Sequence, residues 1–275
     1  DNYLISGSFG ASAAYIYELD NNGDWTIVKD TNGNGIQLST SEGEMLRYGW
    51  SLDITDDYAI VANYSHEFEL DGTADANIGA VFIYERATNG TWGTLDSGTT
   101  YNETQIIKAS NAYDPLNSSY GKNFGSGVSI HGNTILVTAH RDYMNSAGVN
   151  VANTYYGSAY IYERATDGTW GTYYSASYNT ETKRIVAYDA NGNTSLGPEH
   201  ICVSIYGNHA IIGSPSSDPS TQGAVYIINP TTTPVYGPTS LTFSNNILTI
   251  ENNIDSTDTD PVSFVLPAGE EMGSI

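Results

Sequence analysis

Short stretches of alternating apolar and polar residues are each followed, after a tight turn, by a continuous apolar run. The alternating stretches are 51–54, 127–130 and 202–205, and the runs that follow them are 58–62, 134–137 and 209–213. Alternation predicts a half-buried β-strand, whereas a continuous apolar run of this length predicts a strand buried on both faces. Gly132-Asn133 and Gly207-Asn208 separate two of these pairs and accept the positive φ angles of a tight hairpin. Each pair is therefore a predicted hairpin.

A third and a fourth strand follow these hairpins and reveal a repeat. The sequence Gly-Ala-Val-Phe-Ile-Tyr-Glu-Arg-Ala-Thr-Asn-Gly-Thr-Trp-Gly-Thr at 79–94 recurs with few changes at 157–172, 78 residues later, and weaker copies lie at 12–25 and 223–228. The stretch 105–109 recurs at 183–187 with the same offset. A helical period of 3.6 residues is absent over any useful length. The chain is therefore predicted to be all-β, with units of four antiparallel strands.

The first residues match only part of this unit. Residues 3–7 correspond to the second strand, and no copy of the first strand precedes them. We therefore expect that the chain begins within a unit and belongs to something longer.

The order of motifs within the unit resembles a known repeat. Tyr48-Gly49 or Phe124-Gly125 precedes a strand of the Ser-Val-Ser-Ile type, and a Gly-Asn turn, an apolar strand and a Gly-Ala-Val-Tyr-Ile-Tyr strand follow. This order is similar to the FG-GAP repeat of the integrin α-chain head and of many secreted, surface and giant-virus proteins. The resemblance covers residues 1–229. It implies β-propeller-like blades of four antiparallel strands, about three and a half of which are visible.

The chain departs from that family in its turns and in its length. The Gly-Ala-Pro tripeptide survives only as Gly213-Ser214-Pro215, and the hairpin turns at 131–133 and 206–208 lack the Asp-rich calcium loop of integrin blades. Integrin heads close with seven blades, so a partial propeller, a smaller ring and an open stack all remain open here.

The sequence changes character after residue 229. Residues 230–275 begin with a Pro- and Thr-rich segment, which predicts a linker because proline cannot sit in a central strand. The stretch 241–250 then predicts a hairpin, and 262–266 predicts a third strand. This small β extension is interpreted either as a compressed further blade or as a β repeat of the kind found in fibre proteins.

The composition excludes some classes of partner and indicates where the protein is found. The chain of 275 residues has 31 acidic and 9 basic side chains, a formal net charge of −22, which repels nucleic acids and anionic lipid surfaces. An apolar run long enough to cross a membrane is absent from the sequence. The single cysteine, Cys202, lies among apolar strand residues and is predicted to be buried. The acidic balance suits salty or calcium-containing fluid, so we expect an extracellular, cell-surface or virion-surface location.

Two loops have the spacing of calcium ligands. Oxygen-bearing side chains alternate at Asp30, Asn32 and Asn34, and the same spacing recurs at Asp189, Asn191 and Asn193. This is the first half of an EF-hand-type loop, although the closing glutamate is absent at the twelfth position. Asp, Asn and Gly are also ordinary β-turn residues. The loops are therefore candidates for Ca²⁺ binding, and a plain turn is the alternative.

Tyrosine is abundant, with 22 residues, and it clusters in predicted loops and edges. The candidates for ligand contact are Tyr155, Tyr156, Tyr173, Tyr174 and Tyr178. Exposed aromatic rings stack on sugars and anchor protein interfaces. Because tyrosine is also a favoured strand residue, a purely structural role stays an alternative.

Known catalytic motifs are absent from the sequence. The five histidines have no metal-ligand spacing, and neither a nucleophile elbow nor a phosphate loop occurs. We therefore expect no enzyme. The leading hypothesis is a non-catalytic extracellular or virion-surface module for adhesion, for protein or glycan binding, or for assembly with neighbouring subunits. Two alternatives are a secreted polysaccharide-active enzyme and a purely structural fibre or capsid subunit.

Overall fold

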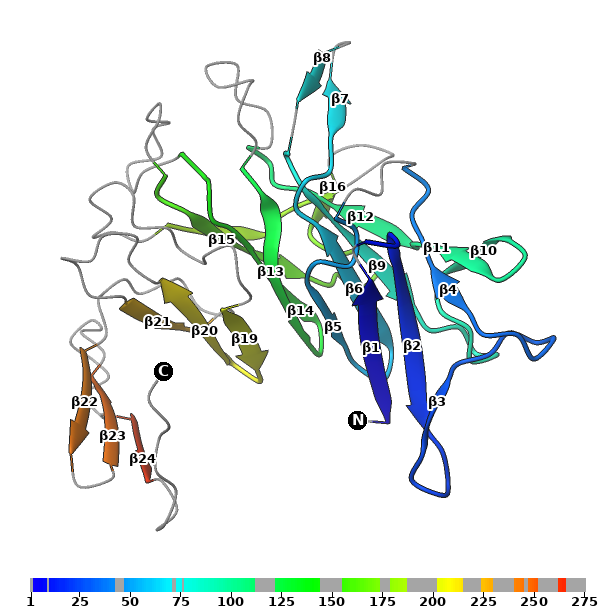
Figure 1. Ribbon diagram of the computed structural model, residues 1–275. Helices are drawn as coiled ribbons and strands as arrows, with labels where there is room; N and C mark the ends of the chain where they lie inside the picture. Colours follow the sequence, from blue (N-terminus) through cyan, green and yellow to red (C-terminus); the bar gives the residue numbers. More distant parts are fainter. Residues whose placement is uncertain are drawn as a thin grey trace.

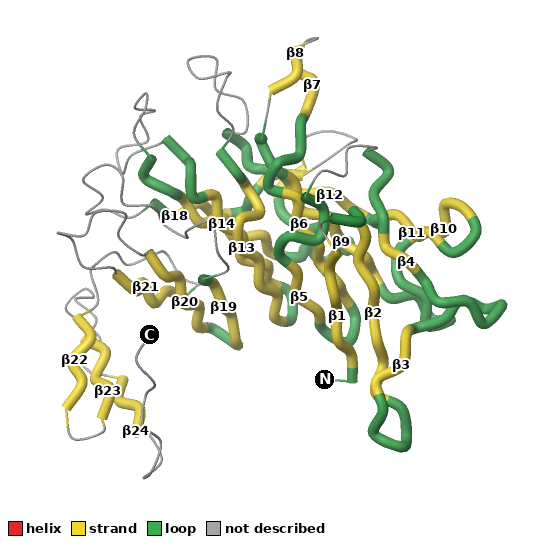
Figure 2. Tube along the Cα trace, viewed as in Figure 1, coloured by secondary structure: helices red, strands yellow, loops and turns green. Residues whose placement is uncertain are grey.

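A computed structural model shows an all-β protein made of several separate sheets (Figure 1). It describes residues 2–8, 10–42, 47–70, 73–75, 77–111, 122–143, 155–173, 179–186, 202–214, 224–229, 240–244, 247–251 and 262–265. All of these residues are strand or loop (Figure 2), so the described part of the chain offers no helix that could cross a membrane. The all-β prediction is confirmed.

Four sheets follow one another along the chain. The first sheet contains β1 (Tyr3–Ser8), β2 (Ala13–Leu19), β3 (Trp25–Ile27), β4 (Gln37–Leu38), β10 (Thr94–Ser97) and β11 (Thr100–Asn102). The second contains β5 (Leu52–Ile54), β6 (Tyr58–Asn63), β9 (Ala80–Glu85), β12 (Gln105–Ile107), β16 (Thr172–Tyr173) and β17 (Asn179–Thr180). The third contains β13 (Phe124–His131), β14 (Thr134–Ala139), β15 (Ser158–Glu163) and β18 (Lys183–Ile185), and the fourth contains β19 (Val203–Tyr206), β20 (His209–Ser214) and β21 (Ala224–Ile228).

Two smaller elements complete the described chain. A ribbon of β7 (Phe68–Leu70) and β8 (Thr73–Asp75) extends beyond the second sheet, between β6 and β9. A three-stranded sheet is formed by β22 (Ser240–Ser244), β23 (Ile247–Glu251) and β24 (Val262–Val265), where the sequence predicted a hairpin and a third strand. The proposed division of the chain at residues 229 and 230 stays a prediction.

The repeat seen in the sequence recurs in the pairing of the strands. Val61 lies opposite Phe82 in the second sheet, and Val137 lies opposite Tyr160 in the third, each at the centre of a pair of long strands. The fourth strands follow the same rule, because Ile107 pairs with Val81 and β18 pairs with β15 through an equivalent antiparallel register. Positions 76 to 78 residues apart are thus structurally equivalent.

The sequence did not predict how consecutive sheets are linked. Instead of staying with its own sheet, the hairpin β10–β11 joins the preceding one, where β11 runs parallel to β4 and Thr100 lies opposite Gln37. The hairpin β16–β17 joins the second sheet in the same way, with Asn179 opposite Ile107. The predicted unit of four antiparallel strands therefore lacks an element. Each of these two hairpins belongs to one repeat in sequence but pairs with the sheet of the repeat before it.

A glycine after the repeated tryptophan allows this crossing. Gly93 and Gly171 have φ angles of +75° and +71°. A Cβ atom at Gly93 would lie 2.4 Å from the carbonyl oxygen of Asn102, and one at Gly171 would lie 2.2 Å from that of Thr180. Only glycine combines this backbone with so close an approach. In the first repeat Thr26 follows the tryptophan instead, and β3 stays paired with its own β2.

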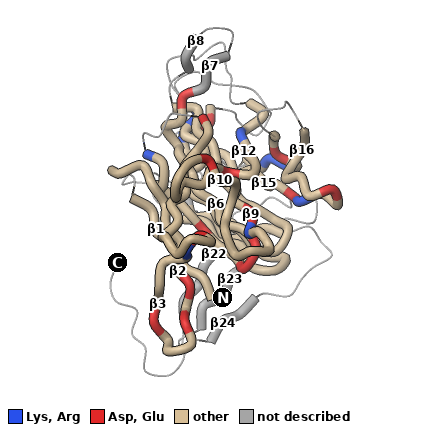
Figure 3. The backbone as a smooth tube through the Cα atoms, turned by 90° about the vertical axis from the view of Figure 1, so that its right-hand side faces the viewer, with Lys and Arg blue, Asp and Glu red and all other residues tan. Residues whose placement is uncertain are grey.

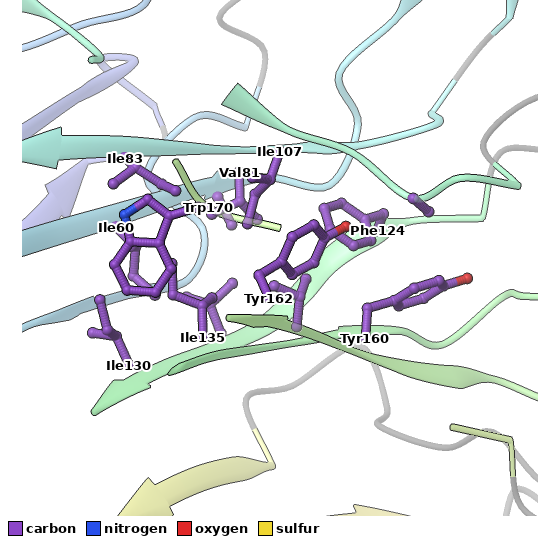
Figure 4. Packing of buried hydrophobic residues seen from close by; sticks show 14 of the residues in the cluster. Ile60, Val81, Ile83, Ile107, Phe124, Ile130, Ile135, Tyr160, Tyr162 and Trp170 are labelled. Atoms are coloured by element: carbon purple, nitrogen blue, oxygen red, sulfur yellow. The ribbon is translucent and has the colours of Figure 1, made fainter. Parts of the chain in front are cut away.

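Apolar side chains fill the space between consecutive sheets. Between the second and third sheets, the indole of Trp170 lies against Ile60 and Ile83, and the ring of Tyr162 lies beside Phe124 (Figure 4). Equivalent clusters lie between the first and second sheets and between the third and fourth. Each central sheet therefore buries both faces, which accounts for the continuous apolar runs of β6 and β14.

Polar bonds also connect the first strands of neighbouring sheets. The carboxylate of Asp53 in β5 accepts a hydrogen bond of 2.8 Å from the backbone N–H of Ile130 in β13. The hydroxyl oxygen of Ser129 in β13 accepts one of 3.2 Å from the N–H of Ile205 in β19. Asp53 and Ser129 occupy equivalent positions, so these bonds recur with the repeat and set the spacing of the sheets.

Two local predictions have different outcomes. Gly132 and Gly207 have φ angles of +55° and +56°, so the tight hairpin turns are confirmed. The prediction that Cys202 is buried is wrong, because its side chain is exposed. Cys202 directly precedes β19 in the fourth sheet, where fewer strands surround each residue than in the central sheets.

Candidate functional site

The two ends of the sheets differ in the length of their connections. At one end, here called the turn end, short turns join β5 to β6, β13 to β14 and β19 to β20. At the other end, the loop end, long connections run from β6 to β9 and from β14 to β15, and the β7–β8 ribbon rises there (Figure 1). Long connections on a rigid scaffold are where binding residues most often lie.

A buried polar cluster lies at the loop end between the first and second sheets. Its members are Glu42, His66 and Lys108. The carboxylate of Glu42 lies 3.5 Å from Nε2 of His66 and 3.7 Å from Nζ of Lys108. His66 and Lys108 are buried, and the ring of His66 packs edge-on against Phe82 at 5.7 Å between centroids. We call this group the first polar cluster.

A second polar cluster lies at the loop end between the second and third sheets. It centres on the buried carboxylate of Asp142, which is 3.4 Å from Nζ of Lys122 and 3.3 Å from Nη2 of Arg184. The hydroxyl of Tyr160 donates a 2.7 Å hydrogen bond to the same carboxylate, and the side-chain amide of Asn111 donates another at 3.3 Å. One acidic group thus meets two basic groups in a buried place.

The two clusters occupy equivalent places in successive repeats. His66 and Asp142 each follow the second strand of their sheet by three residues, and the carbonyl oxygen of each accepts a bond from the N–H of a glycine, Gly79 or Gly157. Phe82 and Tyr160 are equivalent in the same way. The repeat therefore places a buried polar residue at this position between neighbouring sheets. The type of residue differs, because it is histidine in the second sheet and aspartate in the third.

Burial shifts the proton affinities of these groups. Desolvation lowers the pKa of Lys108 from 10.5 to about 8, and Glu42 opposes that shift in part. The contact with His66 lowers the pKa of the Glu42 carboxyl against the effect of burial, with help from Lys108. Burial alone raises the pKa of Asp142, but the charges of Lys122 and Arg184 outweigh it, and the pKa lies below its ordinary value.

This arrangement anchors the bases of the long connections. Lys122 lies two residues before β13, Asp142 follows β14 and Arg184 lies in β18, so one set of ion pairs connects three segments. Lys108, Lys122 and Asp142 are buried in this structure, so their charged groups do not face solvent. The clusters thus hold the bases of the long connections in place.

Of the predicted calcium residues, Asp30, Asn32 and Asn34 lie in one five-residue turn. The Asp30 carboxylate accepts hydrogen bonds of 2.9 and 2.8 Å from the N–H groups of Asn32 and Asn34, and these bonds lower its pKa. Asp20 makes the same pair of bonds in the preceding turn. The geometry agrees with the plain-turn interpretation, and binding of Ca²⁺ stays a prediction.

The rest of the predicted metal set cannot be placed. Asp189, Asn191 and Asn193 lie outside the described residues. Among the residues that are described, no three His, Cys, Asp or Glu side chains gather as a metal site would require.

The predicted tyrosines are not brought together. Tyr155 and Tyr156 lie at the loop end just before β15, both half-buried, and the ring of Tyr155 packs against Tyr143 at 5.1 Å between centroids. Tyr173 lies on the crossing hairpin and is 72% exposed. Tyr174 and Tyr178 lie outside the described residues.

Metal-ligand spacings and catalytic motifs in the sequence do not indicate the polar clusters. The residues of these clusters come from separate segments and meet only through the packing of the sheets. A signal was present in the fourth strands, where Lys108 and Arg184 adjoin isoleucines in segments that read as buried. A charged residue in such a segment predicts a buried partner of opposite charge.

Comparison with known proteins does not show a family for this chain. No protein-family model matches the chain, and no curated protein matches it either. Among solved structures, the chain is similar to the crystal structure of a putative 6-phosphogluconolactonase from Bacteroides fragilis NCTC 9343, with 15% sequence identity and a TM-score of 0.40. That likeness covers 98% of this chain and 64% of that protein, so this chain spans less than two thirds of its length.

One expectation from the sequence is corrected by this finding. We expected no enzyme because known motifs are absent, yet a solved structure to which the chain is similar is described as a putative 6-phosphogluconolactonase, an enzyme. Catalytic groups are defined by their geometry in the fold, so a search for sequence motifs does not exclude them. At this identity the likeness does not transfer a lactonase activity to the chain.

Proposed function

We propose that the chain is an extracellular or surface module of β-propeller-type blades, of the FG-GAP kind, whose loop end binds a protein, a glycan or a neighbouring subunit. Each of the four sheets corresponds to one blade in this proposal. The observation that carries it is the gathering of the long connections at one end of a stack of interlocked sheets.

The interlocking supports a role as a rigid scaffold. Each crossing hairpin is fastened to the sheet it joins: the Glu103 carboxylate accepts a 3.1 Å bond from the N–H of Ser41, and Glu181 accepts a 2.8 Å bond from that of Ser110. The sheets therefore resist sliding past one another. A scaffold of this kind holds loops in fixed relative positions, which lowers the entropy lost on binding.

The polar clusters support the loop end as the binding surface. They lie beneath the long connections and fix the residues at their bases, while the turn end has only short hairpins. Tyr155 and Tyr156 lie at the loop end with part of each ring exposed, and aromatic rings of this kind contribute strongly to protein and glycan recognition.

The charge distribution supports the proposed location and partners. Asp and Glu recur along the edges and turns of the described chain, with few Lys and Arg among them (Figure 3). Three of the nine basic side chains, Lys108, Lys122 and Arg184, form ion pairs within the polar clusters. The clusters also contain the acidic Glu42 and Asp142, so the rest of the surface keeps an acidic balance close to the net charge of −22, which disfavours nucleic acids as partners.

The test is a binding screen with variants at both ends of the sheets. Wild-type protein is applied to a glycan array and to a panel of cell-surface protein ectodomains. Any ligand found is then measured by calorimetry against Tyr155→Ala, Tyr156→Ala and, as the matched control, Tyr206→Ala, because Tyr206 is an exposed tyrosine at the turn end.

We expect that loop-end variants weaken binding at least about tenfold, as loss of an aromatic contact does, while Tyr206→Ala binds like the wild type. Equal weakening by Tyr206→Ala would contradict the assignment of the loop end. A complete absence of ligands in both panels would contradict the binding role itself.

A further inference from the structure

The contacts between consecutive sheets contain a recurring unit of three side chains. Trp92 of the second sheet lies edge-on to Tyr3 of the first, at 5.3 Å between centroids, and the guanidinium of Arg86 lies 5.0 Å from the centre of the same tyrosine ring. In the next interface Trp170 and Arg164 hold Tyr58 at 5.3 and 5.1 Å. The second sheet thus offers tryptophan and arginine to the first sheet and tyrosine to the third.

The first sheet repeats the tryptophan half of this unit on a face that is uncovered. Trp25 and Leu19 occupy the positions of Trp92 and Arg86, and they are 46% and 37% exposed. Leu4, on the same face, is 42% exposed. The equivalent faces of the second and third sheets are fully buried through Phe82, Tyr84, Tyr160 and Tyr162. The first sheet therefore presents an apolar face of the kind that a preceding sheet covers elsewhere in the molecule.

The outer face of the fourth sheet has a histidine where the first and second sheets have the tyrosine of the unit. His209 occupies the position of Tyr3 and Tyr58 at the start of the second strand, and Ile211 occupies the position of Ile5 and Ile60. Ile211 is 46% exposed, whereas Ile60 is fully buried under the third sheet. Val225 and Ile227 lie on the same face as Ile211 and are half-buried. The fourth sheet thus presents the face that a following sheet covers elsewhere.

We propose that copies of this chain associate head to tail, with the fourth sheet of one copy packed on the first sheet of the next. A second copy is the occupant that we propose because its fourth sheet presents Ile211 at the position by which Ile5 and Ile60 pack on the following sheet within the chain. The inference does not depend on the ligand-binding function proposed above, since it involves neither the loop end nor a ligand.

The contact would be weaker than the internal ones. Thr26 keeps β3 on its own sheet, so the first repeat sends no hairpin across the boundary. Glu103 and Glu181, which hold the crossing hairpins in place, each lie two residues before the fourth strand of their repeat. The equivalent residue of the first repeat is Gly35, which has no side chain to make such a bond. Association therefore rests on apolar packing alone, and we expect it to be reversible and dependent on concentration.

Sedimentation velocity of the full chain tests this directly. Measurements run from about 1 to 100 µM, where interfaces of micromolar affinity become populated, and at about 0.15 M salt, which screens the net charge. We expect the mean mass of the wild type to rise to at least twice the monomer mass. The variants Trp25→Glu and Ile211→Glu should each stay monomeric, because each spoils one of the two faces.

A mixture of the two variants separates head-to-tail contact from other modes. Trp25→Glu keeps an intact fourth sheet and Ile211→Glu keeps an intact first sheet, so an equimolar mixture should form a dimer but nothing larger. Leu95→Glu is the matched control, because Leu95 is a 56% exposed apolar residue on the crossing hairpin, away from both faces. It should associate like the wild type.

Three results would overturn the proposal. The first is a wild type that stays monomeric at the highest concentration. The second is unchanged association of Trp25→Glu or Ile211→Glu when circular dichroism shows both to be folded. The third is a mixture that remains monomeric, which would indicate that the single variants lost association through damage to their own fold. Failure here leaves the binding screen at the loop end unaffected, so the two proposals are judged separately.

Discussion

The indole ring of Trp170 lies edge-on against the phenol ring of Tyr58, with 5.3 Å between the ring centroids. Trp92 and Tyr3 show the same separation one repeat earlier. Each pair joins two consecutive sheets, and an arginine, Arg164 in the later pair, lies over the tyrosine ring. The recurrence indicates that the repeat encodes its own interface as well as its own strands.

The tryptophans should therefore differ in their contribution to stability according to the sheet that precedes them. Trp170→Ala removes a buried ring and should lower the free energy of unfolding by about 3–5 kcal/mol. Trp25→Ala removes a half-exposed ring with no preceding sheet and should cost about 1 kcal/mol or less. Urea unfolding followed by circular dichroism measures both. Equal losses would contradict the recurring interface.

The glycine after each tryptophan should be the residue that permits the crossing hairpin. Gly171→Ala places a Cβ against the carbonyl of Thr180 and should cost about 1–3 kcal/mol beyond the strain of a positive φ angle. Gly90→Ala is the matched control, because Gly90 has a φ of +85° and nothing within 4 Å of an added Cβ. Chemical unfolding of the two variants isolates the effect of the close approach. If both lose the same stability, the crossing does not depend on that glycine.

The sequence predicted the strands because their pattern is local. Val61 and Val137 lie in runs whose apolar character reports burial on both faces, and Gly132 marks a turn by its own conformational freedom. Which sheet the hairpin at 94–102 joins is a different matter. Gly93 permits the crossing, but the pairing of Thr100 with Gln37 depends on contacts between segments 63 residues apart.

The polar clusters escaped sequence analysis for a related reason. Lys122, Asp142 and Arg184 are separated along the chain by tens of residues and share no motif, and only the packing of two sheets brings them together. The calcium candidates show the opposite case, in which a motif is visible in the sequence but the structure gives it a different role. Asp30 and Asn34 have a familiar spacing, and in the structure that spacing closes a turn.

The second polar cluster should depend on its single carboxylate. Asp142→Asn leaves the charges of Lys122 and Arg184 without their anion in a buried place and should cost about 3–5 kcal/mol. The exposed Asp57→Asn is the matched control and should cost less than about 0.5 kcal/mol.

The pH dependence of this contribution follows from the lowered pKa of Asp142. Stability from the ionised carboxylate is present above the unfolded value of 3.8 and is lost as the pH falls through the folded pKa. Thermal melts between pH 7 and the acid range should therefore show the wild type and Asp142→Asn converging only at low pH. A difference in melting temperature between the two proteins that stays the same at every pH would contradict a stabilising role of these ion pairs.

Lys108 should give a dependence of the same sign in the alkaline range, because its folded pKa is lowered as well. Its pKa is about 8 in the folded chain against 10.5 for the free side chain, so the unfolded chain binds more protons between these values and stability rises with pH. The penalty for burying the cation is fully present below pH 8 and disappears as the pH approaches 10.5.

A variant isolates this effect from the ionisation of tyrosines. The stability of the wild type relative to Lys108→Met should rise from pH 8 to pH 10, by an amount on the order of 1–3 kcal/mol. Urea unfolding at several values of pH in this range measures the difference. A difference that is flat or that falls with pH would show that Lys108 is not desolvated as the structure indicates.

A substitution at Asp30 distinguishes a plain turn from a calcium site. If the carboxylate serves only to close the turn, Asp30→Ala should lower the melting temperature equally in calcium chloride and in a chelator. Asp20→Ala, which removes the same two bonds from the neighbouring turn, is the control. We expect this outcome from the hydrogen bonds that the Asp30 carboxylate accepts. A wild type stabilised by calcium, with the effect lost in Asp30→Ala alone, would establish the calcium site.

The central claim is that the second and third repeats each send a hairpin to the sheet before them. Cross-linking of Gln37→Cys with Thr100→Cys tests this most directly, because these residues lie opposite each other in the parallel pair of β4 and β11. Cys202 is first replaced by serine, and Ser6→Cys with Tyr15→Cys, opposite each other in β1 and β2, is the positive control. The account predicts that mild oxidation closes an intramolecular disulfide in both pairs, as mass spectrometry detects. A disulfide in the control pair but none between positions 37 and 100 would contradict it.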